Sequence, residues 1–201
     1  MLILAVFSWL LSKHSNKLFA PSDFVDEENY VRMQLLAVGS LAVASAKNPS
    51  SHSEAEIQQI VEVVQSTRPV RAAGSDSWRN RILWVDDRPQ NNVHERQAFE
   101  AMGLVLTLAL STSEAFERLS SQKFAAIISD MGRKEGPREG YVLLDELRKE
   151  DTKTPFFIYA SSKSPEHRRE TAEHLGQGCT NDPQELFQME TRAVFTRVAQ
   201  E

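Results

Sequence analysis

From about residue 81 to the end, the chain alternates short apolar runs with stretches of helical spacing. This pattern is typical of βαβ units, in which helices cover both faces of a parallel sheet. The apolar runs predict five strands, over residues 82–85, 104–110, 124–129, 155–160 and 178–180. Helices are predicted over residues 93–102, from 112 onward, over 141–149 and 165–174, and from 183 onward. We therefore expect an α/β fold with a doubly wound, five-stranded parallel sheet.

The first third of the chain has helical patterning instead. An acidic turn at residues 26–28 suits the start of a helix that continues to about Val43 and stops before Pro49. Its many small residues favour close helix contact, either as a buried helix of a small bundle or as a membrane-inserted helix. Ser53 followed by Glu56 resembles a capping box that begins an amphipathic helix. Residues 1–66 are thus predicted to be a helical region for packing, dimerisation or attachment near a membrane.

The segment Met1–Leu11 is apolar almost throughout. A helix of this length covers roughly 17 Å, well short of the ~30 Å hydrocarbon thickness of a bilayer. Three interpretations stay open: a helix packed on its own protein or on a second copy, an interfacial anchor, or part of a longer membrane helix. If the segment meets a membrane, Lys13 and Lys17 place the rest of the chain on the cytoplasmic side.

Residues 67–80 lack periodicity and contain glycine, proline and serine, which predicts a linker between the helical region and a domain over 81–201. The net charge of −5 and the pI near 5.6 argue against a nucleic-acid partner, because such domains usually present a basic face. The single cysteine, Cys179, excludes an intramolecular disulfide and fits a reducing, cytoplasmic location.

Three aspartates follow two of the predicted strands. Asp86 and Asp87 come directly after the first strand, and Asp130 comes directly after the third. In a flavodoxin-like strand order of 2-1-3-4-5 these strands are neighbours, so the three carboxylates meet at one edge of the sheet. Carboxylates that close together repel unless a cation intervenes, and Mg²⁺ prefers hard oxygen ligands. The alternative is that each aspartate is a solvated loop residue.

Residues 81–190 resemble the receiver domain of response regulators in two-component signalling. The resemblance rests on RILWVDD at 81–87, FAAIISDM at 124–131 with Gly140 beyond it, TPFFIYAS at 154–161 and GCTNDP at 178–183. It implies a phosphorelay module in which Asp130 is the phosphoacceptor. It further implies that Asp86, Asp87 and Asp130 hold Mg²⁺, with a backbone carbonyl near Gly132 as another ligand.

Two positions depart from the pattern of that family. The hydroxyl residue expected at the end of the fourth strand falls on Ala160, although Ser161 follows it. The lysine expected just before a proline after the fifth strand falls on Asp182, whose carboxylate would repel a phosphoryl group on Asp130. These departures favour an atypical receiver, or pseudo-receiver.

Other residues near the predicted site leave alternatives open. The loop after Asp130 is longer than in the family, and its Arg133, Lys134 and Arg138 either replace the missing lysine or form a solvated basic loop. Tyr159, in the fourth strand, is either an aromatic of the switch surface or a packed strand residue. Ser161, Tyr159 and Asp182 are therefore our candidates for contact with the phosphoryl group or for the switch.

We expect a signalling module that acts through protein contacts, with a histidine kinase or another signalling protein as partner and a homodimer as an open alternative. A phosphorylation-independent scaffold would use the same fold and acid pocket. An enzyme, such as a nucleotide or glycosidic-bond hydrolase, is disfavoured because the chain lacks a glycine-rich phosphate loop, a nucleophile elbow and an Asp-x-Asp motif. No catalytic residue is therefore predicted.

Overall fold

The computed structural model describes residues 27–45, 53–67, 74–160 and 164–200. Met1–Leu11 and Ser161 lie outside these ranges, so the expectations for them stay predictions. The elements of the helical region and of the segment after it are α2 (Glu27–Ser45), α3 (Glu54–Gln65) and the 3-10 helix η2 (Gly74–Asn80). Half of the predicted linker thus forms a short helix, in which the Trp78 ring lies under the guanidinium groups of Arg79 and Arg197. The division into domains stays a prediction.

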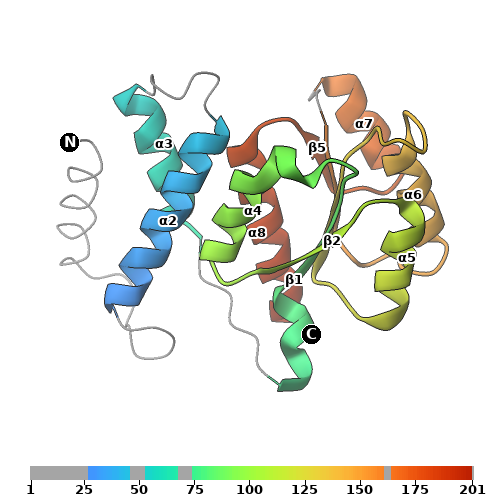
Figure 1. The fold of residues 1–201 in the computed structure, drawn as a ribbon, viewed down its shortest axis with the longest axis horizontal. Helices are drawn as coiled ribbons and strands as arrows, with labels where there is room; N and C mark the ends of the chain where they lie inside the picture. Colours follow the sequence, from blue (N-terminus) through green and yellow to red (C-terminus); the bar gives the residue numbers. More distant parts are fainter. Residues whose placement is uncertain (1–26, 46–52, 68–73, 161–163, 201) are drawn as a thin grey trace.

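The sheet and its helices follow in regular alternation (Figure 1). They are β1 (Arg81–Val85), η3 (Pro89–Asn92), α4 (Val93–Ala101), β2 (Val105–Ala109), α5 (Thr112–Ser121), β3 (Ala126–Ser129), α6 (Glu139–Arg148), β4 (Phe156–Tyr159), α7 (Pro165–Glu173), β5 (Gly178–Thr180) and α8 (Pro183–Gln200). All strand pairs are parallel and their order is β2-β1-β3-β4-β5. The predicted fold class and strand order are confirmed.

Alternate side chains of the central strands point to opposite faces, as strand geometry requires. Ile82 and Trp84 of β1 belong to one hydrophobic cluster, with α4 and α8, whereas Leu83 and Val85 belong to another, with α5 and α6. Both faces of the sheet are therefore buried, which explains why its strands read as nearly continuous apolar runs.

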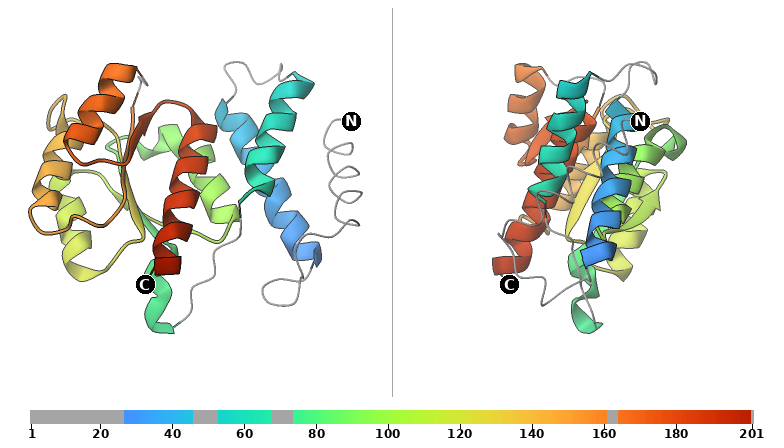
Figure 2. Two further views of the ribbon diagram at one scale, coloured as in Figure 1. Left: turned by 180° about the vertical axis from the view of Figure 1, so that it is seen from behind. Right: turned by 90° about the vertical axis from the view of Figure 1, so that its left-hand side faces the viewer.

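Helices α2 and α3 form a further layer over α4 and α8. Figures 1 and 2 show both helices on the side of the molecule opposite to α5 and α6. Leu41 and Ile60 are fully buried in the cluster that also contains Trp84 and Phe187. The helical region thus shares one continuous hydrophobic cluster with the sheet. No helix among the described residues is long and apolar enough to cross a lipid bilayer.

Local sequence signals position several helix starts. Ser53 and Glu56 form the predicted capping box at α3, with each side chain bonded to the backbone of the other residue. Ser111 and Ser164 accept a backbone N–H at the starts of α5 and α7. Strands β3 and β4 begin later than predicted, although Phe124 and Ala125 before β3 are buried like strand residues. Their apolar character reflects this burial.

Candidate functional site

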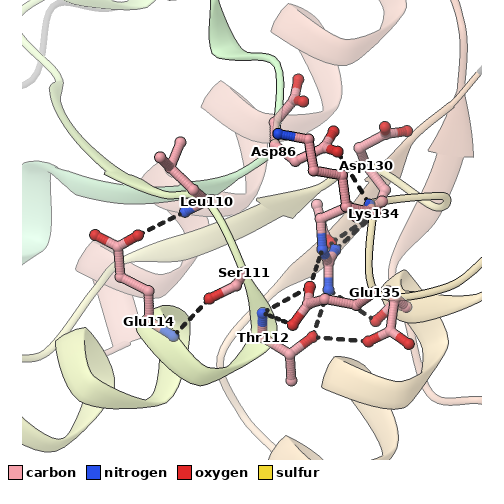
Figure 3. A network of polar contacts seen from close by, with 12 residues as sticks. Asp86, Leu110, Ser111, Thr112, Glu114, Asp130, Lys134 and Glu135 are labelled. Carbon is pink, nitrogen blue, oxygen red and sulfur yellow. Dashed lines mark hydrogen bonds and ion pairs between the residues drawn. The ribbon is translucent and has the colours of Figure 1, made fainter.

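The acid site lies at the carboxyl ends of β1 and β3. These strands pair with Val85 opposite Ser129, so Asp86 and Asp130 leave the sheet at the same level. Asp86, Asp87 and Asp130 each offer a carboxylate oxygen within 4.8 Å of the others. Figure 3 shows Asp86 and Asp130 beside the loop that carries Lys134 and Glu135. The predicted convergence of the three aspartates is therefore present, while their roles stay predictions.

Asp86 is buried and held by hydrogen bonds on both oxygens. Its Oδ1 accepts the backbone N–H of Arg88 at 2.7 Å, and its Oδ2 accepts the side-chain amide of Asn92. Asn92 ends the short helix η3, which follows β1 directly. Asp86 therefore has a fixed orientation and also organises the turn after β1.

Asp87 is only partly satisfied. Its side chain is 7% exposed, and its Oδ2 accepts the backbone N–H of Lys134 at 3.0 Å. Its Oδ1 lies 3.5 Å from Nε of Arg88 and has no hydrogen-bond partner among the described residues. A buried carboxylate oxygen without a hydrogen bond is costly, which is typical of a position that a ligand completes.

Asp130 is half-buried. Burial, followed by the charge of Asp86, raises the pKa of its carboxyl group. The backbone of Met131 and the positive charges of Arg133 and Arg88 act in the opposite direction, but they do not offset the increase. Added positive charge at this site would favour the ionised carboxylate.

The loop after Asp130 is anchored by Arg133, whose side chain is fully buried. Its guanidinium nitrogens donate to Oγ of Ser129 at 2.7 Å, to the carbonyl of Asp130 at 2.9 Å and to Oγ1 of Thr112 at 2.6 Å. It also pairs with Glu135, which accepts the backbone N–H of Thr112 (Figure 3). For Arg133 the solvated-loop interpretation is therefore wrong, because the guanidinium fixes the loop from inside.

The rest of this loop is shaped by Gly140. A Cβ atom there would lie 2.9 Å from Cδ1 of Ile158 and 3.0 Å from the carbonyl of Asp130, so only glycine allows this close approach. Arg138 lies at the surface, where it pairs with Glu170 at 2.6 Å. Gly132 begins the loop two residues after Asp130, and its role as a carbonyl ligand stays a prediction.

A hollow of about 260 Å³ opens beside the trio. Its lining residues come from four segments of the chain: Asp86, Arg88, Asn91, Asn92, Asp130, Tyr159, Ala160 and Asn181. Sequence reasoning missed Arg88, Asn91, Asn92 and Asn181. A weak signal existed, because all four lie between the end of a predicted strand and the start of the next predicted helix, where loops meet the edge of such a sheet.

Tyr159 both packs in the core and lines the hollow. Its ring makes an edge contact with Trp84 at 6.0 Å between centroids, and its hydroxyl donates to Oε1 of the buried Glu95 at 2.9 Å. Burial raises the pKa of Tyr159 far above its ordinary value. The packed-residue interpretation is therefore correct for its side chain, whereas a part in switching stays a prediction.

Asp182 caps a helix. Its Oδ1 accepts the backbone N–H groups of Gln184 and Glu185, at 3.0 and 3.3 Å, in the first turn of α8. Asp182 is not among the residues that line the hollow, although Asn181 beside it is. The carboxylate is thus engaged by backbone donors, and its expected repulsion of a phosphoryl group stays a prediction.

Comparisons with known proteins concern the fold. No protein-family model and no curated protein sequence matches the chain. Among solved structures, the receiver domain of Francisella response regulator 1452 is 21% identical with a TM-score of 0.52, and the match covers 59% of this chain and 98% of that one. A response regulator receiver domain protein from Methanospirillum hungatei is 18% identical with a TM-score of 0.53, over 61% of this chain and 98% of that one.

A receiver domain protein from Clostridium thermocellum is similar to the same extent, with 16% identity and a TM-score of 0.52 over 60% of this chain and 98% of that one. These matches span nearly the whole of each receiver domain. The strand order of this chain is the one expected from its sequence. The chain therefore contains a receiver-type fold, to which α2 and α3 are added.

Proposed function

We propose that the chain is an atypical receiver module that acts through protein contacts and accepts a phosphoryl group on Asp130. The observation that carries the proposal is the trio itself, in which each carboxylate brings an oxygen within 4.8 Å of the others. In addition, Oδ1 of Asp87 is buried and has no hydrogen-bond partner in the described part of the chain. Such an arrangement is costly in an empty site and becomes favourable around a cation.

The donor set fits Mg²⁺. Asp86, Asp87 and Asp130 supply hard oxygen ligands, and Gly132 follows on the same loop. Mg²⁺ is usually held by one or two carboxylates and several waters, so not all three aspartates need to bind it directly. When bound, the ion supplies positive charge that stabilises the transferring phosphoryl group.

The transfer itself is simple in its atoms. A carboxylate oxygen of Asp130 forms a bond to phosphorus as the bond from phosphorus to the donor's leaving group breaks, and the leaving group keeps the electron pair. With acetyl phosphate the products are the aspartyl phosphate and acetate. The chain contributes position, because the Arg133 network holds Asp130 and its loop in place.

A phosphorylation-independent scaffold is the second candidate. It is favoured by Ala160, which brings no hydroxyl to the hollow, and by Asp182, which caps α8 where a lysine would contact the phosphoryl group. In either case the proposed partner is a histidine kinase or another signalling protein, and self-association is a further proposal.

Phosphorylation separates the two candidates. The protein is incubated with acetyl phosphate and Mg²⁺, and intact mass is measured for the wild type, Asp130→Asn and the control Asp145→Asn, which changes an exposed aspartate on α6. The proposal expects one added phosphoryl group on the wild type and the control and none on Asp130→Asn. If the wild type stays unmodified and also binds neither Mg²⁺ nor beryllofluoride, the scaffold is favoured. Release of inorganic phosphate from a nucleotide would instead favour a hydrolase.

A further inference from the structure

We infer that Arg88 is the cation that contacts the phosphoryl group at this site. It takes the role of the lysine that the receiver pattern expects at the position of Asp182. The inference rests on the proposed function, because it assumes that Asp130 receives the group. Arg88 directly follows the acid pair Asp86 and Asp87. No sequence motif identifies it as a residue that contacts a ligand.

The position of Arg88 fits this role. It lines the same hollow as Asp86 and Asp130, and its Nε lies 3.5 Å from the otherwise unpaired Oδ1 of Asp87. Its charge also acts on the carboxyl group of Asp130. The side chain is 60% exposed, so its guanidinium is free to turn within the hollow while the backbone stays bonded to Asp86.

The other cations near the site are less suitable. Arg133 uses its guanidinium nitrogens on Ser129, Thr112, Glu135 and nearby carbonyls. Lys134 reaches the acid trio through its backbone N–H, and its side chain does not line the hollow. Among the described residues that line it, Arg88 is the one with a positive charge.

Arginine also has suitable chemistry. Its planar guanidinium presents several N–H donors in a fork that matches phosphate oxygens. Before a phosphoryl group arrives, the same guanidinium partly neutralises Asp87 and so competes with Mg²⁺ for that carboxylate. Removing Arg88 should therefore have opposite effects on two ligands: tighter binding of Mg²⁺ alone and weaker binding of a phosphoryl analogue.

The test uses the full chain and two readouts. Mg²⁺ affinity is followed by tryptophan fluorescence, since Trp84 contacts Tyr159 at the hollow, and beryllofluoride binding in saturating Mg²⁺ is followed by ¹⁹F NMR. The variants are Arg88→Ala, Arg88→Lys and Lys134→Ala, with Lys149→Ala as the matched control. Lys149 is an exposed cation at the end of α6, next to the opposite edge of the sheet. Circular dichroism checks that each variant is folded.

Arg88→Ala is expected to bind beryllofluoride roughly tenfold or more weakly, the effect of losing a charge-assisted hydrogen bond. The same variant should bind Mg²⁺ up to about fivefold more tightly, the scale of a partly exposed ion pair. Arg88→Lys should recover part of the beryllofluoride affinity. Lys134→Ala, which keeps the backbone N–H that bonds to Asp87, should lose far less beryllofluoride affinity than Arg88→Ala, and Lys149→Ala should behave as the wild type.

Two results overturn the inference and leave the proposed function intact. One is normal beryllofluoride binding by Arg88→Ala when Asp130→Asn has lost it. The other is a loss in Lys134→Ala that Arg88→Ala does not share, which would assign the contact to Lys134. If the wild type itself binds neither ligand, the proposed function fails and the inference fails with it.

Discussion

The two ends of the sheet handle buried charge in different ways. At the amino ends of β4 and β5, the buried Arg148 donates from all three guanidinium nitrogens, to the carbonyls of Leu175, Asp151 and Thr154 and to the side chain of Gln177. At the carboxyl ends of β1 and β3, Oδ1 of Asp87 has no hydrogen bond among the described residues. A charge that is fully hydrogen-bonded within the chain stabilises the fold, whereas an incomplete one is available to a ligand.

The largest expected effect on stability comes from removing the hydrogen bonds of Arg148 at the amino ends of the strands. Arg148→Met keeps most of the side-chain volume but removes the donor to three carbonyls and one of the two donors to Oε1 of Gln177. We expect a loss of about 3 kcal/mol in the free energy of unfolding, measured in urea. Mg²⁺ binding by the folded variant should stay unchanged, and a loss confined to Mg²⁺ binding would contradict the structural role.

Arg133→Met tests a fully hydrogen-bonded charge that lies beside the acid site. Since its guanidinium joins Thr112, Ser129 and Asp130 in the interior, we expect a loss of about 2 kcal/mol in urea unfolding. Here Mg²⁺ affinity should fall as well, because the loop positions the Lys134 N–H against Asp87. Arg138→Met, at an exposed pair, is the control and should change neither quantity.

Glu190 in α8 shows whether an unsatisfied carboxylate is sufficient for ligand binding. It is fully buried, neither oxygen has a hydrogen-bond partner among the described residues, and burial raises its pKa well above the usual range. Because the pKa of Glu190 is raised in the folded state, folding favours its protonated carboxyl group. The stability gained in this way is complete below the unfolded-state pKa and is lost as the pH rises through the folded-state pKa.

At pH 8, the free energy of unfolding of Glu190→Leu, measured in urea, should therefore exceed that of the wild type by roughly 1–2 kcal/mol. The difference should be smaller at pH 5. Glu173→Leu replaces an exposed glutamate and should leave the pH dependence as it is. Equal pH dependence in Glu190→Leu and the wild type would show that Glu190 is not buried in this way. Mg²⁺ affinity should not change, because Glu190 is alone whereas Asp87 belongs to a trio.

The smallest stability effect is expected at Asp130. Burial and Asp86 raise the pKa of its carboxyl group, so its ionised form weakens the folded state as the pH rises through that pKa. Asp130→Asn should gain up to about 1 kcal/mol at pH 7 in urea, while it loses phosphorylation entirely. A destabilised Asp130→Asn would indicate that Asp130 is a structural residue like Arg148.

Much of the fold follows from local signals in the sequence. The alternation of apolar runs and helical spacing predicts all five strands, the flavodoxin-like order expected for them is the observed one, and Ser53 with Glu56 predicts the start of α3. Asp86, Asp87 and Asp130 were found because each directly follows a strand, and parallel neighbours end at the same edge. Their proximity needed no information beyond strand order.

The sequence alone could not show where polar side chains turn after leaving the backbone. Arg133 belongs to a segment with the composition of a solvated loop, yet its guanidinium is buried between β3 and α5, where it bonds to the nearby Ser129 and Glu135 and to Thr112, which comes from another element. Asp182 occupies the position of a lysine but bonds to the first turn of α8. Such choices depend on the sum of hydrogen bonds that only the folded chain provides.

The sequence by itself therefore determined the receiver-type fold, its strand order and the meeting of three aspartates at one edge. Only the tertiary structure decided which of the charged groups around that edge are satisfied. It completes the bonds of Arg133 and Asp86, leaves Oδ1 of Asp87 with Arg88 alone, and places Arg88 in the hollow. The reason is that periodicity records burial along each element, whereas hydrogen-bond partners are set by the packing of several elements at once.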